Sequence, residues 1–547
     1  MRHGFLSKTS NVKGSPAQCP VQAPTSGEQS YDRLFKEPPD AYHGRPKDEV
    51  IAALKEIAEA RRGIKDEPPA DQAGQEPQGE SGETPAGYTY LGQFIIHDLT
   101  RSQIPTKGEA PINHATPSLD LDSVYGGGPM LCPHFFQRPA REKESPHLFY
   151  IGRTAGALQP ANADVPSNQP VDLPRIGPGT GGIFNSGAEK FVSPLIPDDR
   201  NDENLVISQI HGLFLRVHNR VADFLYKQRG LTGDESFRRA RDFVQECYRQ
   251  IVVHDYLKRL LRKEYYEDLI ADKPTRIRYD AKPGPIFLEF TFGAARVCHA
   301  MSRQHYVVNS RIKREISNLR TLLRFSSNRL DAPLPLPADW VINWEHFFEM
   351  PGAAAPLAAR RLTPLLSPVL IDAATSLNDD APRDTVSFRD LWRCYERNLP
   401  TGQTCSRELA GNLPKGDELM TLRSTDIVPQ PSLAAHQFVE PLTKALEKFG
   451  WFQTETPLTY YLAQEASLDE SHGRTFGRLG SYIMASTFRR ALTPVSCGDA
   501  AETKPATFPY STPHGVTTMP EFIGLLTLPE KALIQQIEAT IPKLTNP

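Results

Sequence analysis

The feature that most constrains the fold is a series of long stretches with apolar residues at helical spacing. The stretch from Asn204 to Tyr226 has apolar residues three or four positions apart, at Ile210, Leu213, Phe214, Val217, Val221 and Phe224. The stretch from Ser236 to Lys263 repeats this pattern, at Phe243, Tyr248, Ile251, Val252, Tyr256 and Leu260. Because this spacing gathers apolar side chains on one face of a helix, the chain is predicted to be mainly α.

Weaker patterns of the same kind predict further helices at 47–62, 285–306, 387–397, 433–449, 457–468, 476–491 and 530–540. Alternating runs typical of strands are scarce, and no internal repeat is present. Proline accounts for 49 of 547 residues, well above the average share of about 5%. We therefore expect a mainly α fold with long Pro-rich loops and little β structure.

The sequence predicts three parts. Residues 1–87 are expected to form an N-terminal extension, with a short helix and a polar linker from Lys65 to Gly87. Residues 88–525 are expected to form the main domain, and residues 526–547 a C-terminal helical tail.

The overall charge excludes some partners. With a formal net charge of −3, the chain has no strong field that would favour nucleic acid. No apolar run approaches the length of a membrane span, and the first residues do not resemble a signal peptide. A cytoplasmic location is the default expectation, with signal-independent secretion left open, and the oligomeric state is not indicated.

Seven cysteines are widely spaced and include no CxxC pair; they are Cys19, Cys132, Cys247, Cys298, Cys394, Cys405 and Cys497. Neither a disulfide framework nor a structural zinc site is expected from this pattern.

Three short motifs are separated by about 100 residues each. The first runs from Gly92 through Gln93 to His97 and Asp98, the second is Arg200-Asn201-Asp202-Glu203, and the third is Arg296-Val297-Cys298-His299. A histidine with an arginine on one side of an iron, and a second histidine on the other, are the parts of a haem site that splits peroxide. The order and spacing of these motifs, rather than any one of them, indicate such a site.

Each residue has an expected role. A neutral His97 takes a proton from the peroxide and returns it to the departing oxygen. Arg200 stabilises the charge that develops on that oxygen. Gln93 precedes His97 by one helical turn and can orient water or a halide. A single histidine on an apolar helix is usually only a core residue, so the assignment depends on the combination.

These motifs resemble the animal-type haem peroxidase superfamily, which includes myeloperoxidase, thyroid peroxidase and the cyclooxygenases, and especially its bacterial members. Family proteins read Gly-Gln-x-x-Asp-His-Asp where this chain has Gly92 to Asp98. They also read Arg-x-x-Glu followed by His-Asn-Arg, matching Arg200 to Glu203 and His218-Asn219-Arg220. The resemblance extends from about Tyr88 to Phe522 and implies the fold of that family.

On the other side of the haem, the resemblance implies that His299 binds iron and that Arg296 meets a haem propionate. Family members have an asparagine partner for this histidine, with an arginine three residues later. Counting back from Leu399-Pro400-Thr401-Gly402-Gln403, these positions are Asp390 and Arg393. An aspartate there would give His299 more imidazolate character. The alternative is that Asp390 lies on a surface helix and Asn398 is the partner.

The resemblance also implies a calcium site. The segment from Thr116 to Gly126 resembles the calcium loop of the family, whose ligands join the aspartate that follows the distal histidine. Three carboxylates with hydroxyl and carbonyl oxygens suit calcium, and the alternative is a solvated acidic turn. The expected ligands are Asp98, Thr116, Ser118, Asp120 and Asp122.

Departures from the family pattern bear on the haem. Ile96 replaces the aspartate that forms one haem ester in mammalian members, whereas Glu203 retains the glutamate that forms the other. Asn204 replaces the methionine of the myeloperoxidase sulfonium bond. We expect haem b with at most one ester link, through Glu203, and a weaker oxidant than myeloperoxidase. Phenols, thiocyanate, iodide or bromide are then more suitable reductants than chloride.

The resemblance therefore implies a peroxidase that uses hydrogen peroxide to oxidise small organic donors or (pseudo)halides through ferryl intermediates. A fatty-acid dioxygenase of the same superfamily would have a radical-forming tyrosine where this chain has Arg296. A metal phosphohydrolase of the HD type would use the adjacent pairs His97-Asp98 and His254-Asp255, but it leaves Arg200 and His299 without a role. A haem carrier without activity is the third alternative. His211, His218 and Cys298 are expected to be structural.

Overall fold

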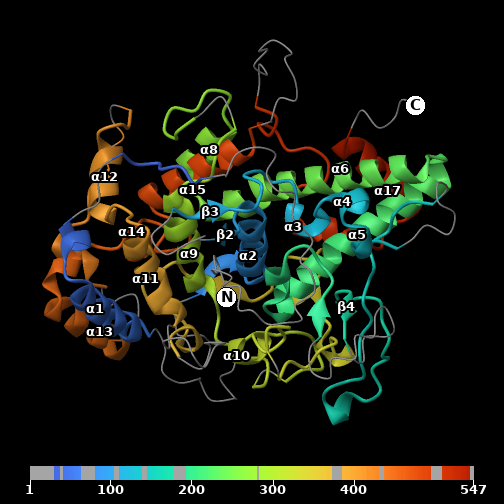
Figure 1. The fold of residues 1–547 in the computed structure, drawn as a ribbon, viewed down its shortest axis with the longest axis horizontal. Helices are drawn as coiled ribbons and strands as arrows, with labels where there is room; N and C mark the ends of the chain where they lie inside the picture. The colour runs from blue at the N-terminus through green and yellow to red at the C-terminus, as the bar shows by residue number, and fades with distance from the viewer. Residues whose placement is uncertain are drawn as a thin grey trace.

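The fold is seen in a computed structural model of the chain (Figure 1). The structure describes residues 30–36, 41–62, 81–103, 110–137, 145–177, 192–279, 283–313, 315–329, 331–372, 385–414, 417, 419–429, 436–493 and 508–541. Cys19 and Cys497, and most of the predicted linker, lie outside these residues.

Several longer helices agree with the sequence prediction to within a few residues; they are α1 (Lys47–Ala60), α5 (Leu205–Arg229), α11 (Val386–Glu396), α13 (His436–Lys448), α14 (Leu458–Leu468), α15 (Arg478–Ala491) and α17 (Glu530–Thr540). The helix α6 (Gly233–Ile251) begins near its predicted start. Three further helices lie outside the predicted ranges; they are α2 (Gly87–Leu99), α8 (Lys263–Ile270) and α12 (Gly402–Ala410). Shorter helices are α3 (Asp122–Tyr125), α4 (Gly128–Leu131), α7 (Lys258–Leu260), α9 (Ala295–Val297), α10 (Leu319–Leu322) and α16 (Met519–Gly524). The mainly α class is confirmed.

Three two-stranded antiparallel ladders are the β structure of the described residues. They pair β1 (Ser81–Pro85) with β6 (Ala358–Arg360), β2 (Ser102–Gln103) with β3 (Ile112–Asn113), and β4 (Arg175–Ile176) with β5 (Ser193–Pro194). The strand β1 falls at the end of the segment that the sequence predicted to be a linker. Its pairing with β6 fixes the approach to α2, a long-range contact that a polar composition does not reveal.

Helix α2 lies at the centre of the molecule (Figure 1), and all of its residues are buried. It packs against α5 on one side and against the 3₁₀ turn Cys298–Met301 on the other. The hydroxyl of Thr89 donates to the Met301 carbonyl oxygen at 3.4 Å. This packing brings the segments that bear His97 and His299 together in one core.

Local sequence explains where α5 begins and ends. The side chain of Asn204 accepts hydrogen bonds from the amides of Val206 and Ile207 at the helix start, which satisfies two donors that have no partner within the helix. Gly230 follows the helix at a φ of +66°, a left-handed conformation that glycine adopts without strain. Asn204 thus holds the turn that carries Arg200 directly against α5.

Two predicted helices are not regular. The predicted helix 236–263 continues from α6 through a π-helical segment, Val252–Leu257, into α7. The predicted helix 285–306 contains a π-helical segment, Phe290–Ala294, and ends in the 3₁₀ turn Cys298–Met301. Periodicity predicts a helix but not these changes of winding, which are frequent at functional sites.

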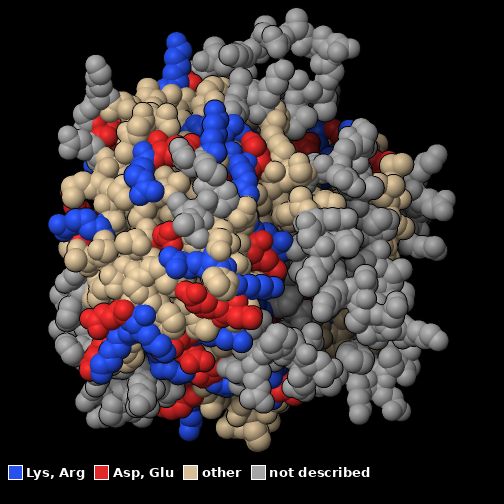
Figure 2. All heavy atoms as spheres, turned by 60° about the vertical axis from the view of Figure 1, so that its left-hand side comes forward, with Lys and Arg blue, Asp and Glu red and all other residues tan. Residues whose placement is uncertain are grey.

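The N-terminal helix α1 packs against α11 and α13, at the left of Figure 1. Figure 2 shows this side of the molecule from the front, where acidic and basic side chains are interspersed. The described helices include none that is both long and apolar enough to cross a membrane.

The cysteines include one exception to the sequence prediction. Cys132 is disulfide-bonded, whereas Cys247, Cys298, Cys394 and Cys405 are buried free thiols.

Candidate active site

His97 lies in the last turn of α2 and is fully buried. Its Nδ1 donates to Oδ1 of Asn201 at 2.9 Å, and Nδ2 of Asn201 donates to Nδ1 of His211 at 3.0 Å. This orientation leaves the lone pair of His97 on Nε2. Burial, and then the charge of Arg200, lower the pKa of His97 to about 3. The imidazole is therefore neutral at physiological pH and able to accept a proton.

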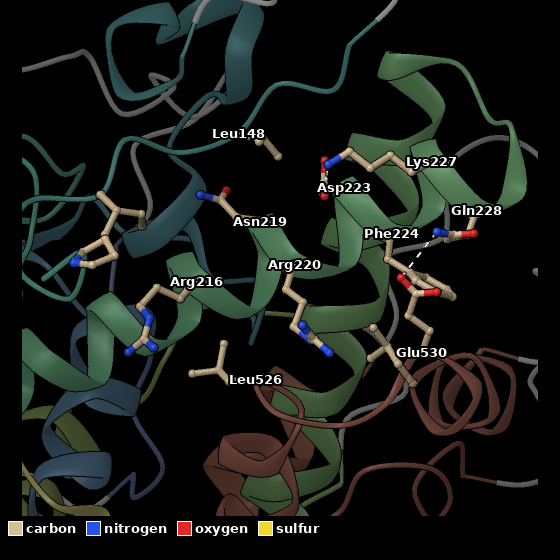
Figure 3. Close-up of a pocket in the computed structure, with 13 residues that line it drawn as sticks. Leu148, Arg216, Asn219, Arg220, Asp223, Phe224, Lys227, Gln228, Leu526 and Glu530 are labelled. Carbon is tan, nitrogen blue, oxygen red and sulfur yellow. Dashed lines mark hydrogen bonds and ion pairs between the residues drawn. The ribbon is translucent and has the colours of Figure 1, made fainter.

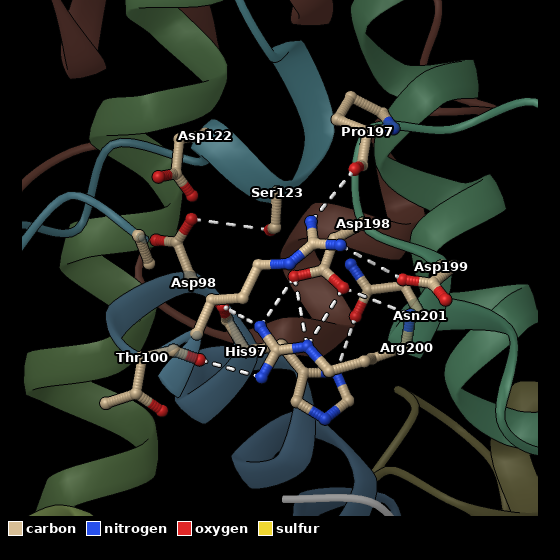
Figure 4. A network of polar contacts seen from close by, with 12 residues as sticks. His97, Asp98, Thr100, Asp122, Ser123, Pro197, Asp198, Asp199, Arg200 and Asn201 are labelled. Carbon is tan, nitrogen blue, oxygen red and sulfur yellow. Dashed lines mark hydrogen bonds and ion pairs between the residues drawn. The ribbon is translucent and has the colours of Figure 1, made fainter. Parts of the chain in front are cut away.

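Arg200 lies beside His97 but does not point at its ring. The guanidinium donates from Nη2 to the His97 carbonyl oxygen at 2.9 Å and from Nη1 to the Thr100 carbonyl oxygen at 2.7 Å. Its Nε and Nη2 also donate to the carboxylate of Asp198, at 2.9 and 2.6 Å (Figure 4). The cation expected from sequence is thus close to the histidine, bound to the carbonyl end of α2 and balanced by an aspartate that the sequence analysis missed.

Gln93 lies one turn before His97 and joins α2 to the start of α5. Its Nε2 donates to Oε2 of Glu203 at 3.1 Å, and its Oε1 accepts from Nδ2 of Asn204 at 3.0 Å. All three side chains are buried. The structure therefore brings together Gln93, His97, Arg200 and Glu203, as the sequence predicted.

His299 is held by Asp390 from α11. Nδ1 of His299 donates to Oδ2 of Asp390 at 2.7 Å, and Oδ1 of Asp390 lies 3.6 Å from Nη1 of Arg296. Although burial alone would raise the pKa of Asp390, the neighbouring His299 and Arg296 hold it below its usual value. Because Asp390 is buried and itself makes this hydrogen bond, the structure favours it over the alternative partner, Asn398.

Arg393, which the resemblance placed near the haem, lies on α11 three residues after Asp390. Its Nη1 donates to Glu396 at 2.5 Å. Among the described residues, Arg393 therefore pairs with Glu396 on its own helix rather than with His299. Arg296 is nearer, since it contacts Asp390 and lies 5.6 Å from the centroid of the Phe292 ring. Burial lowers the pKa of Arg296 to about 10.

Tyr31 is a residue of this region that the sequence analysis missed. Its hydroxyl is hydrogen-bonded to that of Ser102, and its ring packs edge-on against Phe292 at 5.7 Å between centroids. Burial raises the pKa of Tyr31 to about 12, opposed by the charges of Arg200 and Arg296. The N-terminal segment thus reaches a position between the motifs of His97 and His299. No local pattern indicates this, because the contact joins residues far apart in the sequence.

Three carboxylates converge next to His97. Oxygen atoms of Asp98, Asp120 and Asp122 lie within 4.8 Å of one another. The hydroxyl of Thr116 donates to Asp120 at 2.7 Å, and that of Ser118 donates to the same carboxylate at 3.0 Å. The structure therefore brings together all five predicted calcium ligands.

The electrostatics of this acidic cluster favour a bound cation. Burial, together with the charge of Asp120, raises the pKa of Asp122 to about 8. Burial and the two neighbouring carboxylates also raise the pKa of Asp98. Since a divalent cation would offset this repulsion, the donor set fits a hard metal ion.

The metal site that an HD-type phosphohydrolase would need, with His254 and Asp255 among its ligands, is not formed. His254 is hydrogen-bonded to the Tyr266 hydroxyl, and Asp255 accepts from Tyr88 and Arg259. Within the described ranges, the one group of acidic or metal-binding side chains close enough to hold an ion is the aspartate cluster. The HD-type reading therefore has no structural basis in the part of the chain that is described.

Cys298 is adjacent to His299 but is not suited to bind iron. Burial raises the pKa of its thiol to about 12, although a hydrogen bond with Tyr256 opposes the shift. A protonated thiol is a poor metal ligand, which agrees with the expected core role.

Residues 89–332 match the family described as animal haem peroxidase. The matched residues include His97, Arg200 and His299, and the match confirms the resemblance inferred from the motifs. No curated protein matches the sequence.

Among solved structures, the fold is similar to peroxidase A from Dictyostelium discoideum, at 15% identity and a TM-score of 0.50, over 85% of this chain and 84% of that chain. It is also similar to a fatty acid alpha-dioxygenase from Oryza sativa, at 12% identity and a TM-score of 0.51, over 95% of this chain and 84% of that chain. At such identities the similarity shows the fold alone, and it is shared by a peroxidase and a dioxygenase. The class of oxidoreductase depends on the site.

Proposed function

We propose that this chain is a haem-dependent peroxidase that reduces hydrogen peroxide with electrons from small organic donors or (pseudo)halides. The observation that carries the proposal is the pair of buried histidines with different Nδ1 partners, Asn201 for His97 and Asp390 for His299. One histidine is suited to move a proton, and the other is suited to bind iron.

The donor set fits a haem group. The hydrogen bond to Asp390 fixes His299 in the tautomer whose Nε2 carries the lone pair, as an iron ligand requires. Arg296 supplies a buried cation for a propionate carboxylate. Bound haem would supply the redox chemistry that splits the O–O bond.

The residues on the other side handle protons. Nε2 of His97 takes a proton from peroxide and delivers it to the departing oxygen, which leaves as water. Arg200 acts by fixing the end of α2, through its bonds to the carbonyls of His97 and Thr100, and by lending positive charge to the site. Asn201 holds the His97 ring in its orientation. With an organic donor, two electrons and two protons complete the reduction of one peroxide to two waters. With a (pseudo)halide, the second oxygen is transferred to the anion, and one water forms.

The runner-up is a fatty-acid dioxygenase, which shares the fold. The position three residues before His299 is Arg296, paired with Asp390, rather than the tyrosine that forms the radical in those enzymes. This substitution favours the peroxidase.

Two further assignments belong to the proposal. Glu203 is the carboxylate placed to form one ester with the haem, since Gln93 holds it beside His97. The aspartate cluster holds calcium, with Thr116 and Ser118 as further ligands, and so fixes the helix that ends at His97. Because Ile96 and Asn204 exclude the other two covalent links of the mammalian enzymes, phenols, thiocyanate or iodide are the proposed reductants.

The test is an absorption spectrum of the haem-loaded chain before and after hydrogen peroxide, compared with His97→Ala. We expect haem to bind to both proteins, and the variant to react about a thousandfold more slowly, because acid–base catalysis contributes roughly 10²–10⁴-fold. The matched control is His218→Gln, a buried histidine of α5 that contacts Tyr125. Haem binding without a response to peroxide would indicate a carrier or an oxygenase, and no haem uptake would refute the proposal.

A further inference from the structure

A second site lies on α5, away from the turn that precedes it. A cavity of about 580 Å³ opens between the C-terminal half of α5, the segment 148–170 and the start of α17 (Figure 3). Its volume is within the usual range for small-molecule sites, about 300–1,000 Å³. It is lined by Leu148, Ile151, Pro170, Arg216, Asn219, Arg220, Asp223, Phe224, Lys227, Gln228, Leu526, Glu530 and Leu533.

The acidic side chains of this cavity already have partners. Asp223 pairs with Lys227 at 2.8 Å, and Glu530 accepts from Nε2 of Gln228 at 3.3 Å. Asn219 is likewise engaged, since its amide bonds both the amide and the carbonyl of Phe149. Asp223 therefore neutralises Lys227, whereas the hydrogen bond from the neutral Gln228 leaves the negative charge of Glu530 in place.

Two arginines lack a carboxylate partner. Arg216 has no hydrogen bond or ion pair with any residue in the described part of the chain, and burial lowers its pKa. Arg220 donates to the Leu528 carbonyl, but its Nε is buried without an acceptor among the described residues. Figure 3 shows both side chains on one side of α5, with Leu526 close to them. Both arginines are partly buried, and withdrawing a guanidinium from water without an anion is unfavourable.

The rest of the lining is apolar. Phe224 and Leu533 are buried in it, and Leu148, Ile151 and Leu526 are partly buried. The three cations and two carboxylates of the lining leave one positive charge. A ligand that neutralises this charge and covers the apolar wall has one negative charge and an apolar chain.

We propose that this cavity binds a monocarboxylate with an aliphatic chain, whose carboxylate pairs with Arg216 and Arg220 and whose chain lies along Phe224, Leu526 and Leu533. A guanidinium binds a carboxylate through two parallel hydrogen bonds, and the single net charge favours a carboxylate over a doubly charged phosphate monoester. This site is separate from the histidine site and does not depend on the proposed peroxidase activity.

The test is calorimetric titration of the full chain with dodecanoate below its micelle concentration, and with dodecanol as the uncharged analogue. We expect saturable binding of dodecanoate that weakens at least tenfold in Arg216→Gln and in Arg220→Gln. Dodecanol should bind the wild type and both variants equally. The matched control is Lys263→Gln, which removes one exposed charge elsewhere and should leave dodecanoate binding unchanged.

Two outcomes would overturn the proposal. One is dodecanoate binding that is absent, or equal in wild type and Arg216→Gln when both melt cooperatively. The other is binding that is lost in His97→Ala but retained in the arginine variants, which would place the ligand at the histidine site. If the chain binds dodecanoate as expected but does not react with peroxide, the peroxidase proposal fails and the proposal of a carboxylate site stands.

Discussion

His97 and His299 are both buried imidazoles whose Nδ1 donates a hydrogen bond, yet the acceptors differ in charge. His97 donates to the neutral amide of Asn201 at 2.9 Å, whereas His299 donates to the carboxylate of Asp390 at 2.7 Å. Burial, and then the charge of Arg200, lower the pKa of His97 to about 3, and the hydrogen bond to the neutral Asn201 opposes this shift only in part. An anionic acceptor makes His299 a more electron-rich ligand. The two histidines therefore differ in the charge of the group that holds each ring.

The surroundings of the two residues extend this contrast. The amide of Asn201 is itself bound to His211, and the neighbouring charge is Arg200, which Asp198 balances. Around His299, the carboxylate of Asp390 is shared with Arg296. His97 is thus joined to neutral side chains beside an ion pair, whereas His299 donates directly to a carboxylate that also contacts a cation.

The largest expected effect comes from giving His299 a neutral hydrogen-bond acceptor like the one that His97 has. In Asp390→Asn, the neutral amide no longer strengthens the imidazole, and removal of such a partner typically costs about 10–100-fold in metal affinity or activity. We also expect the reduction potential of the haem iron to rise, because the ferric state loses an electron-rich ligand. Potentiometric titration and peroxide kinetics measure these effects. Glu396→Gln, on the same helix, is the control, and an unchanged potential would contradict the account.

Removing the proposed calcium should destabilise the end of α2 that carries His97 and leave the surroundings of His299 unchanged. Calcium at a hundredfold its Kd stabilises a folded protein by about 2.7 kcal/mol. Because the pKa of Asp122 is raised to about 8 and that of Asp98 is raised as well, protons compete with the ion, and the stabilisation should grow from pH 5 to pH 8. Melting curves with calcium or a chelator test this.

Two variants separate calcium binding from a general charge effect. Asp120→Asn should abolish the calcium-dependent increase in melting temperature. Asp164→Asn, in an exposed ion pair with Arg311, should retain it. If chelation leaves both stability and the peroxide reaction unchanged, the cluster does not hold a structural ion.

The reverse exchange gives His97 an anionic partner. In Asn201→Asp, a carboxylate next to the imidazolium should raise the pKa of His97 by about 1–3 units. The base would then be protonated in mild acid, so the peroxide reaction should slow by up to about tenfold at pH 5 and remain unchanged at pH 8. Stopped-flow rates across this range are the measurement. Asn412→Asp, at an exposed position, is the control, and parallel pH profiles of wild type and Asn201→Asp would contradict the assignment.

The smallest effect concerns acid stability. Burial lowers the pKa of His211 to about 3, while in the unfolded chain it is near 6.5. The unfolded state therefore binds more protons below pH 6.5, so this histidine costs stability as the pH falls from 6.5 towards 3. His211→Asn should reduce the slope of the free energy of unfolding against pH by about 1.4 kcal/mol per pH unit in this range. Urea titrations at pH 7.5, 6 and 5 measure it, and equal slopes would show that His211 is not buried neutral.

Periodicity and short motifs predicted much of this protein. Apolar residues at helical spacing determine α5, α11, α13, α14, α15 and α17, because a helix buries one face whatever it packs against. The motifs at His97, Arg200 and His299 indicated which residues meet, and counting back from Gly402 indicated Asp390. These signals are local, or follow a fixed order along the chain, and so they can be read from the sequence.

The tertiary structure alone decided the contacts between distant segments. Tyr31 reaches the site from a segment that looked like an extension, and Asp198 turns the charge of Arg200 towards the end of α2. The cavity at Arg216 depends on α17 lying across α5, more than 300 residues apart along the chain. Such contacts depend on which faces pack together, and packing is determined by the whole set of apolar surfaces rather than by any local pattern.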